Sequence, residues 1–78
     1  MPRAYVLIEA PFEKIPSVRN ALGSLANCLA IVEGLYPGEL VVHIEGSDAE
    51  SLNDGLTRQL PGIEGVERVT VWSITNQV

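Results

Sequence analysis

The positions of apolar and polar residues along the chain predict four strands and two helices. Segments rich in apolar and β-prone residues, each bounded by Pro, Gly or polar turn residues, indicate strands at residues 4–10, 29–35, 39–45 and 66–74. Two sets of apolar residues recur at spacings of three and four, which is the period of a helix. The sets are Phe12, Ile15, Val18, Leu22 and Leu25, and then Leu52, Leu56 and Leu60. The elements therefore follow the order β-α-β-β-α-β.

The residue types at the ends of the two helices predict where each helix begins and ends. Pro16 falls in the first turn of the first helix, where a missing N–H costs no helical hydrogen bond. We expect this helix to end near residues 26–27. Ser47 and Glu50 have the spacing of a capping box, which predicts that the second helix begins at Ser47. Pro61 and the glycine after it are expected to end that helix.

Side chains alternate between the two faces of a strand, so each predicted strand contributes to two surfaces. One face is almost purely apolar, and we expect both helices to pack against it. It consists of Ala4, Val6, Ile8, Leu40, Val42, Ile44, Val69 and Val71. The opposite face is mixed and consists of Tyr5, Leu7, Glu9, Val41, His43, Arg68, Thr70 and Trp72.

Both helices are needed to cover the first face, so the second face has no cover within the chain. It is too apolar for a face in contact with solvent only, and exposed patches of this kind usually mark interaction surfaces. We interpret it as a dimer interface, with a ligand groove as the less favoured alternative. The expected interface residues are Tyr5, Leu7, Val41, His43, Thr70 and Trp72.

The length and composition of the chain are those of one small domain, residues 1–78. A single cysteine and a single histidine exclude an internal disulfide and a four-ligand zinc site, which leaves self-association as the simplest additional source of stability. Ten acidic residues against five scattered basic ones argue against direct nucleic-acid binding. We find no apolar run long enough to span a membrane and no signal-peptide pattern, and we expect a cytoplasmic protein.

The sequence has no convincing catalytic or metal-binding constellation. His43 has no nucleophile near it in the sequence, and Cys28 has no basic neighbour to activate its thiol. The carboxylates have no metal-ligand spacing such as that of a calcium loop. We therefore expect a protein that is not an enzyme and that uses no cofactor or metal.

The segment from Gly34 to Glu39 is longer than a tight hairpin requires. It contains an aromatic ring, Tyr36, and a carboxylate, Glu39, that could meet an amine or a polar small molecule. A plain hairpin turn built from Pro37 and Gly38 explains the same residues equally well. Both interpretations stay open at this point.

Three segments together resemble the ligand-binding domain of Lrp/AsnC transcriptional regulators, also called the RAM domain. They are AYVLIEA at residues 4–10, LVVHIEGSDAESLN at 40–53 and GVERVTV at 65–71. The resemblance implies a ferredoxin-like α+β fold, with a four-stranded antiparallel sheet and two helices on one face. It also implies homodimers formed through the other face, further assembly into larger oligomers, and small effectors, commonly amino acids, bound where dimers meet.

Full-length members of that family carry an N-terminal helix-turn-helix that binds DNA. We expect residues 1–78 to form a single RAM-type domain without that segment, similar to the stand-alone members. Such members sense a ligand or associate with a full-length regulator. By position, the effector-binding loop is Tyr36, Pro37, Gly38 and Glu39. Its acidic residue is retained in kind, but the glycine and aromatic positions are exchanged relative to the family.

Two alternatives have the same order of elements. NapD-like maturation chaperones bind a twin-arginine signal peptide on their sheet, and an acidic protein is electrostatically suited to such a peptide. The GVERV segment at residues 65–69 fits the regulator family better. The other alternative is a ferredoxin-like subunit whose only role is assembly.

Overall fold

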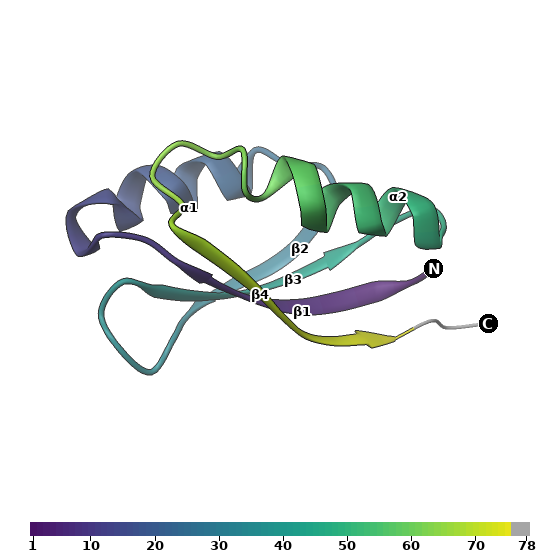
Figure 1. Cartoon of the computed structure of the whole chain (residues 1–78), viewed down its shortest axis with the longest axis horizontal. Coiled ribbons are helices and arrows are strands. Elements are labelled where there is room, and N and C mark those ends of the chain that lie inside the picture. Colours follow the sequence, from purple (N-terminus) through teal and green to yellow (C-terminus); the bar gives the residue numbers. More distant parts are fainter. Residues whose placement is uncertain (76–78) are drawn as a thin grey trace.

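A four-stranded antiparallel sheet forms one layer of the computed structural model, which describes residues 1–75 (Figure 1). Its strands are β1 (Arg3–Glu9), β2 (Cys28–Glu33), β3 (Glu39–Glu45) and β4 (Arg68–Thr75). They lie in the order β2-β3-β1-β4, so the first and third strands of the chain occupy the middle. This arrangement confirms the predicted ferredoxin-like fold class.

The helical segments all lie on one face of the sheet, as Figure 1 shows. They are the 3-10 turn η1 (Phe12–Lys14), the helix α1 (Ile15–Gly23), the helix α2 (Ala49–Asp54) and the π-helical turn η2 (Gly55–Gln59). Within residues 1–75, none of them is both long enough and apolar enough to cross a bilayer. The other face of the sheet is covered by no described element.

The helix boundaries correct two details of the sequence prediction. Pro16 lies in the first turn of α1 as predicted, but α1 ends at Gly23, about one turn early, because the N–H of Leu25 already bonds the Leu22 carbonyl in a tight turn. The N-cap of α2 is Asp48 and not Ser47, since the Asp48 carboxylate accepts the Ser51 N–H at 2.7 Å. Both residue types cap helices well, so the sequence did not separate them.

The hydrophobic core lies between the helices and the sheet. It consists of Ala4, Val6, Ile8, Ala10, Val18, Leu22, Leu40, Val42, Ile44, Leu52, Leu56 and Leu60. Six of the eight residues predicted to face the helices are buried. Val69 is only half-buried and Val71 is 41% exposed, because β4 is an edge strand with a neighbour on one side only. Phe12, the first residue of the helix-period series, has a side chain that is 70% exposed. Phe12 belongs to η1, where the α-helical spacing does not apply.

Both edge strands contain a bulge, whereas the central pairing of β1 with β3 is regular. In β4, Val71 pairs with Val6 and Ser73 with Tyr5, so Trp72 is the extra residue. The regular alternation that we predicted for this strand therefore ends at Val71. A similar shift interrupts β2 at Leu29. Bulges disrupt the ladder at a sheet edge and hinder the addition of further strands.

Burial predicts a large loss of stability for one apolar residue of the first helix-period series and almost none for another. Leu22→Ala should lower the free energy of unfolding by about 2–5 kcal/mol, because it leaves a cavity under α1. Phe12→Ala should change it by about 0.5 kcal/mol or less, as expected of an exposed position. Urea denaturation followed by tryptophan fluorescence measures both. A loss at Phe12 as large as that at Leu22 would contradict the described packing.

Candidate functional site

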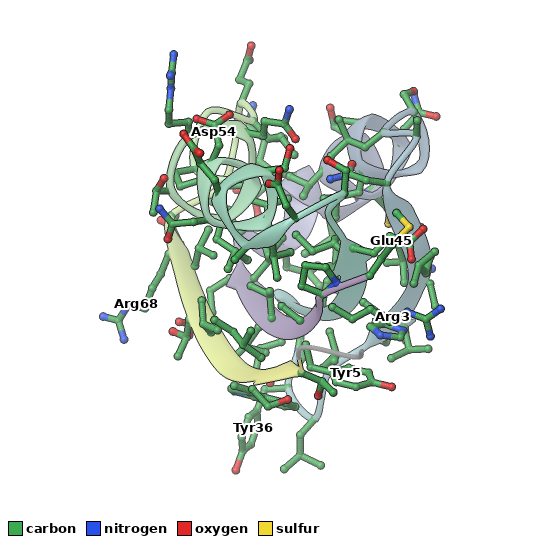
Figure 2. All side chains as sticks on the ribbon, turned by 90° about the vertical axis from the view of Figure 1, so that its right-hand side faces the viewer. Arg3, Tyr5, Tyr36, Glu45, Asp54 and Arg68 are labelled. Carbon is green, nitrogen blue, oxygen red and sulfur yellow. The ribbon has the colours of Figure 1, made fainter. Side chains whose placement is uncertain are left out.

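The open face of the sheet, opposite the helices, has two central rows of uncharged side chains across all four strands. The strand register places the members of each row side by side, in the order β2, β3, β1, β4. The first row is Val32, Val41, Leu7 and Thr70, and the second row is Ala30, His43, Tyr5 and Ser73. Figure 2 shows Tyr5 projecting from the sheet on the side away from the helices. Much of this surface is exposed, including 46% of Tyr5 and 56% of Val32.

The structure brings five of the six predicted interface residues into these rows, and places Trp72 in the adjacent bulge with 58% of its surface exposed. The sequence analysis missed Ala30 and Val32. Both faces of β2 are apolar along residues 29–32, so no alternation marked which side chains face outward. The register with β3 was the missing information.

A stacked ring pair lies at the centre of the open face. The rings of Tyr5 and His43 are parallel within 7°, with their centroids 4.2 Å apart. The two residues are direct cross-strand partners on β1 and β3. Such pairs each stabilise a sheet by about 0.2–1 kcal/mol, and this one also holds both rings in a fixed orientation. The centre of the face is therefore ordered before any partner binds.

Charged residues border the two central rows at both ends. At one end, Arg3 Nε lies 3.5 Å from Glu45 Oε2, and Figure 2 shows both side chains at the same end of the sheet. At the other end, Arg68 Nε lies 3.6 Å from Glu9 Oε2, and Glu39 stands opposite Glu9 on β3. A neutral centre with a charged border is the usual anatomy of a protein interface.

The loop between β2 and β3 is held as a well-defined turn. The Gly34 N–H bonds the Glu39 carbonyl at 2.9 Å, and the Glu39 carboxylate accepts the Tyr36 N–H at 3.1 Å. Gly38 has a φ of +88°, and its carbonyl accepts the Ala10 N–H at 2.9 Å. The Glu39 carboxylate is thus part of the turn itself, which supports the hairpin interpretation of this segment.

The same loop also borders a small hollow of about 270 Å³. All four predicted ligand residues, Tyr36, Pro37, Gly38 and Glu39, line it. Leu35 and Phe12 line it too, and both side chains are largely exposed. The structure therefore brings the predicted residues together. Their role in binding stays a prediction.

A larger open groove of about 850 Å³ runs between α1 and edge strand β2. Its apolar lining includes Phe12, Ile15 and Ile31. A pair of opposite charges also lines it, Arg19 from α1 and Glu33 from β2. Sequence reasoning missed this groove, because it depends on where α1 lies relative to β2. The helix α1 ends at Gly23, earlier than the sequence predicted, and leaves part of β2 uncovered.

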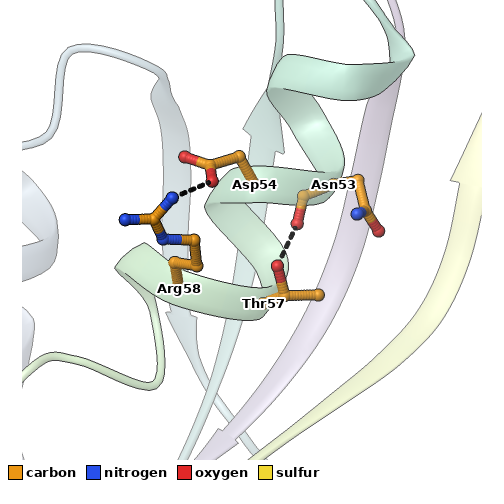
Figure 3. A network of polar contacts seen from close by, with 4 residues as sticks. All are labelled: Asn53, Asp54, Thr57 and Arg58. Atoms are coloured by element: carbon orange, nitrogen blue, oxygen red, sulfur yellow. Dashed lines mark hydrogen bonds and ion pairs between the residues drawn. The ribbon is translucent and has the colours of Figure 1, made fainter.

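Side chains with other chemistry form no second site. Among residues 1–75, no three His, Cys, Asp or Glu side chains are grouped so that they could hold a metal ion. Burial raises the pKa of the Cys28 thiol, so the thiol is protonated near neutral pH. On the outer face of α2 and η2, Arg58 pairs with Asp54 at 3.3 Å and Thr57 donates to the Asn53 carbonyl (Figure 3). These contacts lie within one helical turn and stabilise the helix locally.

Solved structures of several proteins share this fold. No family model matches the sequence, and no curated protein matches it. TTHA0845 from Thermus thermophilus is 26% identical, with a TM-score of 0.84 over 100% of this chain and 96% of that one. AsnC from E. coli is 14% identical, with a TM-score of 0.85 over 99% of this chain and 52% of AsnC.

The Tat proofreading chaperone NapD from E. coli has the same fold. It is 23% identical, with a TM-score of 0.81 over 96% of this chain and 78% of NapD. At such identities the likeness to AsnC and NapD shows the fold alone. It therefore supports the architecture that the Lrp/AsnC resemblance implies, and it is equally compatible with the chaperone alternative.

The turn geometry predicts different effects for two glycine substitutions. Gly38→Ala should lower the free energy of unfolding by about 1–3 kcal/mol, because φ is positive there. The new Cβ would also lie 2.6 Å from the Ala10 carbonyl oxygen. Gly23→Ala, at a position with no atom within 4 Å, should be neutral or slightly stabilising. Thermal unfolding of both variants measures this, and equal effects would contradict the described loop.

Proposed function

We propose that this chain is a small-molecule-sensing and self-associating domain related to the ligand-binding domain of Lrp/AsnC regulators. Two copies pack through their open sheet faces, and an effector, an amino acid, binds beside the loop that carries Tyr36 and Glu39. Within this proposal the domain is not an enzyme, works in the cytoplasm and has a full-length regulator of the same family as a further partner.

The observation that carries the proposal is the open face. Its central rows hold no Asp, Glu, Lys or Arg, and its exposed large side chains include Tyr5 and Val32, with the exposed Trp72 in the adjacent bulge. Association that removes apolar surface from water is stabilised by about 25 cal/mol for each Å² buried. The bulges in β2 and β4 hinder pairing at the sheet edges, so packing face to face is the favourable mode of association.

The loop supports the effector part of the proposal. Its backbone is fixed by the contacts of Gly38 with Ala10 and of Glu39 with Tyr36, so the hollow beside it exists before a ligand arrives. Leu35 and Tyr36 are 85% and 66% exposed, which is costly unless another surface covers them. A site between dimers would cover these side chains and enclose a ligand at the same time.

A new carboxylate on the open face should dissociate the assembly. Trp72→Asp, and Val32→Asp at the other edge, should raise the dissociation constant at least about a hundredfold, because burying an unpaired charge costs several kcal/mol. Both side chains are more than half exposed, so the monomer should still fold. Light scattering on a sizing column measures the mass. Ser17→Asp, which adds the same charge on α1, is the control, and a wild-type mass for both face variants would refute the interface.

A second function is favoured by one specific observation. The carboxylates of Glu9, Glu39 and Glu45 lie at the two ends of the open face, and the fold is also that of NapD. The Arg3 and Arg68 side chains pair with Glu45 and Glu9, and a peptide with adjacent arginines could replace them as partners of these carboxylates. In this reading the protein is a chaperone that closes on a signal peptide.

Solution mass and peptide binding separate the two functions. The sensor predicts a dimer or larger particle whose mass shifts when a pool of amino acids is added. The chaperone predicts a monomer that binds a twin-arginine peptide at least about tenfold more tightly than its twin-lysine counterpart, since arginine forms bidentate pairs with carboxylates. Light scattering and isothermal titration calorimetry give both readouts on the same sample. A monomer that ignores amino acids would refute the sensor.

A further inference from the structure

The groove between α1 and β2 has the dimensions and lining of a small-molecule site. Its volume of about 850 Å³ falls within the range of about 300–1,000 Å³ that is usual for such sites. Its apolar surface is provided by Phe12, Ile15 and Ile31, and its polar groups are few. None of these residues belongs to the open sheet face, so self-association through that face leaves the groove accessible.

The charges of the groove come as one adjacent pair of opposite sign. Arg19 Nη2 on α1 lies 3.3 Å from Glu33 Oε1 on β2. Their side chains are 41% and 81% exposed, and an ion pair at the surface is weak. The contact uses one nitrogen of a guanidinium that carries five N–H donors. A ligand can therefore bond both partners without an appreciable loss to the protein.

A neighbouring cation and anion match a ligand whose own two charges are neighbours. We propose that this groove binds an α-amino acid with a large apolar side chain, whose carboxylate pairs with Arg19 and whose ammonium pairs with Glu33. The apolar side chain of the ligand then lies on Phe12, Ile15 and Ile31. A zwitterion has no net charge, so the net charge of −5 of the chain does not repel it.

The groove is continuous with the loop that borders the smaller hollow. Phe12, Ile15 and Glu33 line both cavities. A ligand held by Arg19 and Glu33 would therefore touch the base of the loop that carries Tyr36. This inference rests on the proposed sensing function. It narrows the effector to an amino acid with a large apolar side chain and places it in the groove, from which it can reach the exposed loop.

The test is a titration of the full chain with L-phenylalanine, L-leucine and glycine, followed by amide NMR. We expect L-phenylalanine and L-leucine to shift the signals of Arg19, Ile31 and Glu33, and to bind at least about tenfold more tightly than glycine, which lacks an apolar side chain. Arg19→Gln and Glu33→Gln should each weaken binding about tenfold, since each removes one charged hydrogen bond. Arg58→Gln, which breaks a similar exposed pair far from the groove, should have no effect.

Two ligand analogues assign the charges. N-acetyl-L-phenylalanine has no ammonium, so Glu33→Gln should no longer weaken its binding, whereas Arg19→Gln still should. L-phenylalaninamide has no carboxylate, so Arg19→Gln should no longer weaken its binding, whereas Glu33→Gln still should. Shifts that are absent, that are confined to residues 35–38, or that survive both substitutions would overturn the inference. If the protein is larger than a monomer but the groove signals do not move, the groove inference is wrong and the proposed self-association still holds. If a monomer binds the ligand in the groove, the proposed dimer is wrong and the groove inference still holds.

Discussion

The regular pairing of β1 with β3 sets the position of every other part of this molecule. Seven residue pairs join the two strands without interruption, from Arg3 with Glu45 to Glu9 with Glu39. A slip of one residue would move the buried set to the outside and the Tyr5–His43 pair to the inside. The centre of the second face also carries apolar side chains, Leu7 and Val41, but the two helices lie on one face only. The open face is a direct consequence of that imbalance.

The limits of the helical layer explain both candidate sites. The helix α1 ends at Gly23 and lies beside β2 without covering it fully, so Ile31 is only half-buried and a groove remains. On the other side of the sheet, no described element covers Val41 or Tyr5. A small domain gains stability by removing such surface from water, so self-association and ligand binding draw on the same physical cause.

AsnC and NapD share this fold at 14% and 23% identity, and a fold alone does not determine what its surfaces bind. In this chain, the residues of the open sheet face determine what that face can bind. Here the centre of that face is neutral and its ends carry Arg3, Glu45, Glu9 and Arg68. The centre without Asp, Glu, Lys or Arg favours a second sheet, whereas a cationic peptide would have to replace Arg3 and Arg68 as partners of Glu45 and Glu9.

The sequence by itself determined the element order, the core and one face of the sheet. Local periodicity carries that information, because residues two apart on a strand and three or four apart on a helix share a face. It did not determine that Phe12 lies outside the core, that Trp72 occupies a bulge, or that Val32 joins the open face. Nor did it place Arg19 beside Glu33. Those features depend on where one element ends relative to another, and only the tertiary packing decides that.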